Sequence, residues 1–270
     1  FQNNPSEFLR YLRADKVLET QGLLSPRILE ENKSLKYLLM DYYPTNNSSK
    51  YFKREEIKTI LPKALQNIIH LQQPRNKFSG IPVKAQTNLM KDALKGIETY
   101  ISYFNHKIQI GYYLNRLIQI SLKKNLENIT KYKPRLVHGD FFLDNLIYYK
   151  RNIFVIDHQD LHYNHPCLDI ASLIFDARRQ YSPKVEDRCI KEYAKKSNQP
   201  LKQTIYDIHL VSLARNLRIL GNWINLYKSG KPQYLKKYRK ATWAQIFKHV
   251  EYLRFWDLRE LFEEVYKKTK

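Results

Sequence analysis

The segment that decides the fold reads HGDFFLDN over residues 138–145 and VIDHQD over residues 155–160. Residues 146–149 and 153–156 are two β-type runs, separated by the polar residues 150–152. The first run directly follows HGDFFLDN, and the second overlaps the start of VIDHQD. Short apolar runs on either side of a polar turn predict a β-hairpin. The polar side chains of both quoted stretches are therefore expected at the ends of short strands.

Three of these side chains form a pattern suited to phosphoryl transfer. Asp140 and Asn145 have the D-x-x-x-x-N spacing of the protein-kinase catalytic loop, and Asp157 follows one hairpin later. A carboxylate can accept the proton of an attacking hydroxyl, and oxygen ligands suit the Mg²⁺ held on nucleotide phosphates. Each residue alone is also typical of a turn or a strand end. Their order and spacing together favour the catalytic interpretation.

The pattern His138-x-Asp140-x-x-x-x-Asn145 followed by Ile156-Asp157 resembles the signature of the aminoglycoside phosphotransferase/choline kinase family. That family has a fold similar to protein kinases. Residues 165–178 and 214–235 further resemble segments of the bacterial N-acetylmuramate/N-acetylglucosamine anomeric kinases. The resemblance extends over almost the whole chain. The sequence departs from the family pattern at two places: His158 stands where the family has Phe, and no Gly precedes Pro166.

The resemblance implies a role for each matched residue of the two motifs. Asp140 would be the catalytic base. His138 would support the catalytic loop, as would Asp169, an acid at the start of its helix. Asn145 and Asp157 would hold Mg²⁺ and, through it, the phosphates of ATP.

Other residues are expected to contact the nucleotide or the acceptor. The backbone groups of Asp41 and Tyr43, at the hinge between the two lobes, would meet adenine. Asp160, Arg215 and Arg218 are candidate substrate contacts. The two arginines lie three residues apart on one helix face, so they can point at the same substrate, and an ion-paired or solvated surface is the alternative.

The fold class implied is α+β and protein-kinase-like, mostly the helical C-terminal lobe with only part of the N-terminal β lobe. Periodicity predicts strands at residues 27–30 and 35–40, and helices at residues 5–21, 53–71, 87–125, 167–180, 185–197, 203–228 and 240–268. The expected domains are residues 1–43, a remnant of the N-terminal lobe ending at the hinge, and residues 44–270, the C-terminal lobe.

The first residues resemble the helix that follows the phosphate-binding lysine of the family. The phosphate-covering loop and that lysine are therefore expected to be missing from these 270 residues. Glu7 and Asp15 are both candidates for the acid that pairs with such a lysine. A transition-metal site at His158 and His162 is not favoured, because this segment reads as a loop.

Composition excludes several function classes. Lys and Arg number 47 against 26 Asp and Glu, a net charge of +21, but no nucleic-acid-binding motif accompanies the charge, so nucleic acid is not the expected partner. The seven glycines cannot form a GxGxxG or GxxxxGK[ST] motif. The two cysteines favour a reducing cytoplasm, and no apolar run reaches the roughly 18 residues of a membrane span.

These observations predict an ATP-dependent small-molecule kinase with Mg²⁺ as its metal. The favoured acceptor is a hydroxyl of an amino sugar, N-acetylmuramate or N-acetylglucosamine, in cell-wall recycling. The alternatives are an aminoglycoside kinase, a choline-type kinase, or a truncated kinase-like protein without activity. The sequence leaves the oligomeric state open.

Overall fold

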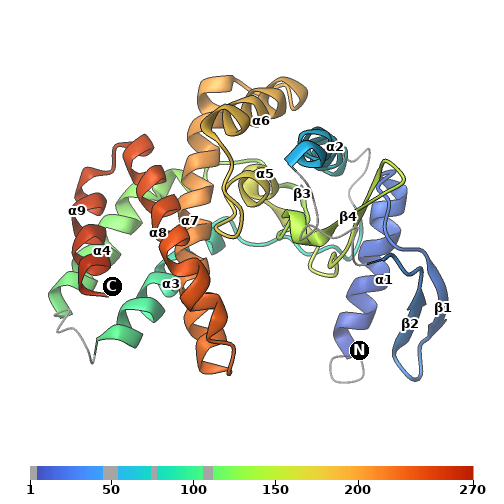
Figure 1. Cartoon of the computed structure of the whole chain (residues 1–270), viewed down its shortest axis with the longest axis horizontal. Helices are drawn as coiled ribbons and strands as arrows, with labels where there is room; N and C mark the ends of the chain where they lie inside the picture. Colours follow the sequence, from blue (N-terminus) through green and yellow to red (C-terminus); the bar gives the residue numbers. More distant parts are fainter. Residues whose placement is uncertain (1–4, 45–53, 74–77, 106–111, 270) are drawn as a thin grey trace. The chain divides into compact units, whose positions relative to one another are not determined.

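The computed structural model describes residues 5–44, 54–73, 78–105 and 112–269. The chain divides into two compact units, and Figure 1 colours it along the sequence. The first unit comprises residues 1–84, 133–174 and 183–199, and the second comprises residues 85–132, 175–182 and 200–270. The first unit carries the catalytic-type loop and the hairpin, and the second consists of helices.

The first unit begins with the expected helix, α1 (Pro5–Thr20). Gly22 ends it with a φ of 71°, a left-handed conformation that favours glycine. The Leu23 amide donates to the Leu18 carbonyl at 2.9 Å, which completes a Schellman motif. The chain therefore reverses sharply, and the predicted strands follow as an antiparallel hairpin, β1 (Ile28–Asn32) and β2 (Tyr37–Met40).

Two further strand pairs frame the quoted motifs. The predicted hairpin is present as β4 (Leu146–Tyr149) and β5 (Asn152–Val155). The other pair joins β3 (Arg135–Val137) to β6 (His162–Asn164) in antiparallel register. The expectation of a loop around His162 was wrong. His162 pairs with Val137, 25 residues earlier in the chain, and such a pairing has no local signal in the sequence.

Three helices complete the first unit: α2 (Arg54–Gln72), α5 (Cys167–Ile174) and α6 (Pro183–Lys196). Every residue of α5 is buried. The prediction that this helix continues to residue 180 was wrong. Asp176 accepts a hydrogen bond from the backbone amide of Arg178 at 3.0 Å, and this turn replaces further helix.

The second unit contains α3 (Asn88–Phe104), α4 (Tyr112–Asn125), α7 (Leu201–Lys228), α8 (Gln233–Leu253) and α9 (Trp256–Lys268). The predicted helix over residues 87–125 corresponds to α3 and α4, and residues 106–111 lie outside the described residues. The prediction of one helix over residues 240–268 was wrong. Arg254 adopts a left-handed φ of 57° and separates α8 from α9.

Helices α3 and α7 approach closely at two glycines. A Cβ placed on Gly96 would lie 2.3 Å from the carbonyl oxygen of Leu217, and one on Gly221 would lie 2.7 Å from the Cα of Gly96. Only glycine permits this separation of the two backbones. No helix within the described ranges is long and apolar enough to cross a membrane.

Candidate active site

A buried carboxylate holds the start of the catalytic-type loop. Asp169, in the first turn of α5, accepts the backbone amides of His138 at 2.8 Å and of Gly139 at 2.9 Å. Its side chain is fully buried. Hydrogen bonds to a charged acceptor are stronger than neutral ones, and a buried carboxylate needs them. The two bonds fix the backbone of the residues immediately before Asp140.

Gly139 makes the turn at this point. Its φ is +93°, and a Cβ there would lie 2.7 Å from Cε1 of His162. A larger residue would therefore meet both an unfavourable backbone conformation and the ring of His162. The loop consequently lies directly against β6, and it delivers the exposed Asp140 at the surface of the first unit.

His138 joins the loop to the segment that carries Asp157. The backbone amide of Asp140 donates to Nδ1 of His138 at 3.4 Å, so the ring proton belongs on Nε2, which lies 3.1 Å from the carbonyl oxygen of Ile156. Burial, with a smaller effect of neighbouring His158, lowers the pKa of His138 to about 4 despite the nearby carboxylates of Asp140 and Asp157. The ring is therefore neutral at physiological pH and acts as a support.

Asn145 is the second link between the two motifs. Its Nδ2 donates to the carbonyl oxygen of Asp140 at 3.0 Å, and its own carbonyl accepts the amide of Ile156 at 3.0 Å. The first bond fixes the orientation of the side-chain amide, so Oδ1 is the end presented as an acceptor. The structure thus brings Asp140, Asn145 and the residue before Asp157 together, as the sequence pattern requires.

Asp157 has an uncommon backbone conformation. Its φ is 62°, in the left-handed region that Asp and Asn tolerate better than most residues. Its exposed carboxylate accepts a hydrogen bond from Nε2 of Gln159 at 3.1 Å. Strained residues of this kind are concentrated at functional sites, where surrounding structure holds them.

The structure distinguishes between the two acids of α1. Oδ1 of Asp15 accepts the hydroxyl of Ser25 at 2.6 Å and lies 3.4 Å from Nε2 of buried His158. Burial acts to raise the pKa of Asp15, but the bonds from His158 and Ser25 bring it below its usual value. Glu7 instead accepts Nε2 of Gln159 at 3.3 Å, the same nitrogen that donates to Asp157. Glu7 is therefore the acid linked to Asp157 through Gln159, and the pairing of either acid with a lysine stays a prediction.

Sequence reasoning missed Gln159. It lies two residues after Asp157 and connects that carboxylate to Glu7, 152 residues earlier. Only its place in the VIDHQD stretch could have singled it out.

The expected hinge follows β2. The amide of Asp41 donates to the carbonyl of Arg27 at 3.0 Å, so this amide is occupied within the first unit. The ring of Tyr43 packs against Phe154 and Tyr149 of the β4–β5 hairpin, with centroids 4.6 and 5.4 Å apart. The roles of Asp41 and Tyr43 toward adenine stay predictions.

The three candidate substrate contacts have different surroundings. Asp160 forms an ion pair with Arg10 at 3.2 Å, and both side chains are well exposed. Arg215 is buried on α7 in the second unit, and Arg218 is half-buried one turn later. The alternative of a solvated surface therefore does not hold for Arg215. The roles of these residues toward a substrate stay predictions.

The oxygen donors of this site fit Mg²⁺. Mg²⁺ is commonly held by one or two protein oxygens together with phosphates and water. The carboxylate of Asp157 and the oriented Oδ1 of Asn145 provide such donors. Within the described ranges, no group of three or more His, Cys, Asp or Glu side chains could hold a metal by itself.

Comparison with known proteins identifies the family of the chain. Residues 2–200 match the phosphotransferase enzyme family. A 105-residue stretch is 31% identical to the N-acetylmuramate/N-acetylglucosamine kinase of Caulobacter vibrioides, covering 36% of this chain and 29% of that protein. The matched stretch thus spans less than a third of that relative.

Solved structures share the fold. A choline/ethanolamine kinase family protein from Mesorhizobium loti superposes with a TM-score of 0.64 and 11% identity, over 94% of this chain and 83% of that one. The ADP-bound aminoglycoside phosphotransferase APH(2'')-Ib superposes with a TM-score of 0.61 and 18% identity, over 97% and 85%. With its family match, its protein-kinase-like α+β fold and its clamped catalytic-type loop, the chain belongs to the phosphotransferase enzyme family.

Proposed function

We propose that this protein transfers the γ-phosphoryl group of ATP to a hydroxyl of a small molecule. The arrangement of the catalytic-type loop carries the proposal. Asp169 fixes the backbone before Asp140, and Asn145 bonds both to Asp140 and to the residue before Asp157. Catalysis of phosphoryl transfer depends mainly on such positioning and on electrostatic stabilisation.

Each residue has a proposed task in this reaction. The carboxylate of Asp140 accepts the proton of the attacking hydroxyl. His138, neutral and buried, and Asp169 hold the loop that presents it. Asn145 and Asp157 hold Mg²⁺, which when bound neutralises charge on the phosphates. One structural relative is an ADP-bound phosphotransferase, which supports a nucleotide as co-substrate.

The proposed acceptor is an amino sugar, N-acetylmuramate or N-acetylglucosamine, with cell-wall recycling as the setting. The name of the Caulobacter vibrioides relative and the motifs at residues 165–178 and 214–235 support it. Aminoglycosides and choline are the alternatives, because kinases named for these acceptors are among the structural relatives. The cytoplasm is the proposed compartment, since Cys167 and Cys189 are both buried free thiols. The proposed lobes remain residues 1–43 and 44–270.

The test is phosphoryl transfer from Mg²⁺-ATP to a panel of N-acetylmuramate, N-acetylglucosamine, kanamycin and choline, with Asp140→Asn as the critical variant. Loss of a general base lowers kcat by about 10²–10⁴-fold, while KM for ATP changes little. Asp144→Asn, an exposed carboxylate of the same loop, is the matched control and should retain turnover. Normal turnover of Asp140→Asn would overturn the proposed role of this carboxylate.

A further inference from the structure

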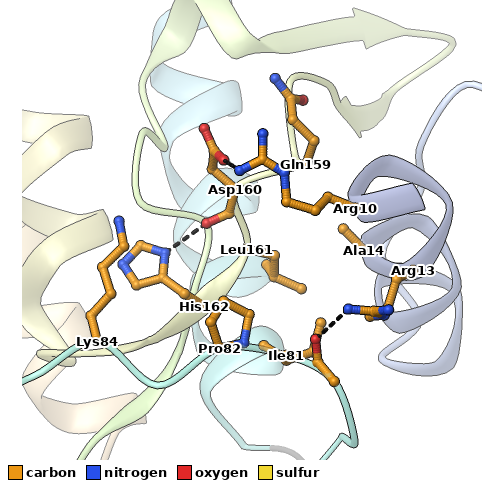
Figure 2. A pocket seen from close by; sticks show the side chains of 11 residues that line it. Arg10, Arg13, Ala14, Ile81, Pro82, Lys84, Gln159, Asp160, Leu161 and His162 are labelled. Atoms are coloured by element: carbon orange, nitrogen blue, oxygen red, sulfur yellow. Dashed lines mark hydrogen bonds and ion pairs between the residues drawn. The ribbon is translucent and has the colours of Figure 1, made fainter. Parts of the chain in front are cut away.

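A pocket of about 530 Å³ lies within the first unit (Figure 2). One of its lining residues, His162, lies against Gly139 of the catalytic-type loop. Three segments form its walls: one face of α1, residues 80–84, and residues 159–162. The volume lies within the range of small-molecule binding sites. Asp160, a candidate substrate contact, and Gln159 lie in this lining, but no ligand group has been assigned to the space itself.

The walls of the pocket carry a positive charge. Arg10 and Arg13 project from α1, and Lys84 lies beside His162 on the other side of the view in Figure 2. Asp160 is the acid of the lining. Burial, with a further effect of the Lys84 charge, lowers the pKa of His162 to about 4, so this ring is neutral at physiological pH. Three cations against one anion leave a net charge of +2, which favours an anionic ligand.

Arg13 has a defined position. Its Nη1 donates to the carbonyl oxygen of Gly80 at 2.7 Å. Gly80 has a φ of +72°, and a Cβ there would lie 3.0 Å from Nε of Arg13. A larger residue at this position would crowd the guanidinium and would also have to adopt an unfavourable left-handed φ, so glycine suits the position. A guanidinium has five N–H donors in a fixed fork, a geometry that matches a carboxylate or phosphate.

The ion pair between Arg10 and Asp160 is exchangeable. The two groups are 3.2 Å apart, with side-chain exposures of 46% and 65%. Exposed ion pairs contribute little to stability, because water and salt screen them. A second carboxylate or a phosphate entering the pocket can therefore compete with Asp160 for Arg10 at small cost.

His162 is the wall between the pocket and the catalytic-type loop. Its Nδ1 lies 2.6 Å from the carbonyl oxygen of Asp160, and its Nε2 accepts Nδ2 of Asn164 at 3.0 Å. These bonds fix the ring, whose Cε1 contacts the space next to Gly139. Asp140 is the next residue along the chain. A molecule whose hydroxyl meets Asp140 can therefore extend an acidic substituent past His162 into the pocket.

We propose that this pocket binds the acidic group of the acceptor substrate, with Arg13 and Lys84 as its contacts. The proposal rests on the proposed function, and it narrows the acceptor to a sugar or similar hydroxyl compound that carries a carboxylate. N-acetylmuramate has such a carboxylate on its lactyl ether, and N-acetylglucosamine is the same sugar without it. The two sugars are therefore a matched pair of probes.

The experiment compares Arg13→Gln and Lys84→Gln with Lys16→Gln. Lys16 is an exposed cation of α1 outside the pocket lining, so its variant controls for the loss of one charge from a protein of net charge +21. Binding of each sugar is measured calorimetrically with Mg²⁺-ADP present, and KM is measured where turnover occurs. Inorganic phosphate serves as a competing anion.

Each pocket variant is expected to weaken the binding of N-acetylmuramate about tenfold, because one charged hydrogen bond is lost. The binding of N-acetylglucosamine should be unaffected, and Lys16→Gln should change the affinity for neither sugar. Phosphate should compete with N-acetylmuramate only while Arg13 and Lys84 are present.

The pocket assignment would be overturned if Arg13→Gln and Lys84→Gln weakened the binding of both sugars equally. It would also be overturned if their effect on N-acetylmuramate binding were no larger than that of Lys16→Gln. Phosphate that binds through Arg13 without displacing N-acetylmuramate would also overturn it, since the pocket would then be a separate anion site. Failure of the wild type to phosphorylate either sugar would contradict the proposed acceptor, but the calorimetric comparison would still decide the pocket.

Discussion

The two compact units achieve their geometry by different means. In the first, strands of three to five residues are too short to define a site alone, and buried hydrogen bonds such as those of Asp169 hold the loop in place. In the second, helices of 13 to 28 residues pack through apolar side chains and through close contact of Gly96 with Gly221. The difference indicates that buried hydrogen bonds position the loop of the first unit, whereas close helix packing defines the second unit.

The clamp formed by Asp169 on the backbone amides of His138 and Gly139 tests this difference most directly when Asp169 is replaced. Asp169→Asn puts an amide nitrogen where one of two backbone amides needs an acceptor, so the first unit should lose about 3 kcal/mol of unfolding free energy. Turnover should fall as well, because Asp140 loses its support. Chemical denaturation and steady-state kinetics measure the two effects.

Asp257→Asn is the matched control in the second unit. Asp257 accepts hydrogen bonds from Ser121 and Asn125, but it is largely exposed and remote in sequence from the loop. Its variant should cost less than about 1 kcal/mol. Similar losses of stability and activity in the two variants would contradict the proposed contrast between the units.

Gly96→Ala tests the packing of the second unit. The added methyl group would lie 2.3 Å from the carbonyl oxygen of Leu217, a backbone atom that cannot move independently. Overpacking of this kind costs about 1–3 kcal/mol. Gly230→Ala is the control, since nothing lies within 4 Å of its added methyl and only the φ of +85° opposes it. Thermal unfolding that is unchanged in Gly96→Ala would show that α3 and α7 are not in this close contact.

Acid should destabilise both units. Burial lowers the pKa of His138 and His162 to about 4 and that of His165 and His209 to about 3, against 6.5 in the unfolded chain. Because the folded pKa is depressed, the stabilising contribution is complete above pH 6.5 and is lost as the pH falls toward 4. Each histidine contributes a slope of about 1.4 kcal/mol per pH unit in this window.

Denaturation measured between pH 7 and pH 4.5 checks this expectation. His209→Gln, in the second unit, should remove one such slope. A stability that stays constant over this pH range would contradict neutral burial of these rings.

The smallest effect on stability concerns two residues with the same left-handed backbone conformation. Arg254 has a φ of 57° between α8 and α9, and Asp157 has a φ of 62° in the site. Arg254→Gly should stabilise the protein by less than about 1 kcal/mol and leave turnover unchanged, since glycine relieves the strain but gains entropy on unfolding. Asp157→Gly should also not destabilise the fold, but it should abolish turnover. Full activity of Asp157→Gly would contradict the proposed role of its carboxylate in holding Mg²⁺.

Features encoded over short stretches could be predicted from the sequence. The D-x-x-x-x-N loop with Asp157 one hairpin later, the β4–β5 hairpin, and the helix that ends at Gly22 all depend on residues close together in the chain. Apolar periodicity and the conformational preferences of glycine act at this range. The sequence by itself therefore determined the family, the α+β class and the core of the candidate site.

Contacts between distant segments were decided by the tertiary structure alone. The clamp joins residues about 30 apart in the chain, Glu7 meets Gln159 across 152 residues, and β6 pairs with β3 and with residues 82–84. The different partners of Glu7 and Asp15, the burial of Arg215 and the cationic pocket follow from the same kind of contact. Such pairings leave no local pattern, because their free energy comes from burial and hydrogen bonding that arise only once the segments meet.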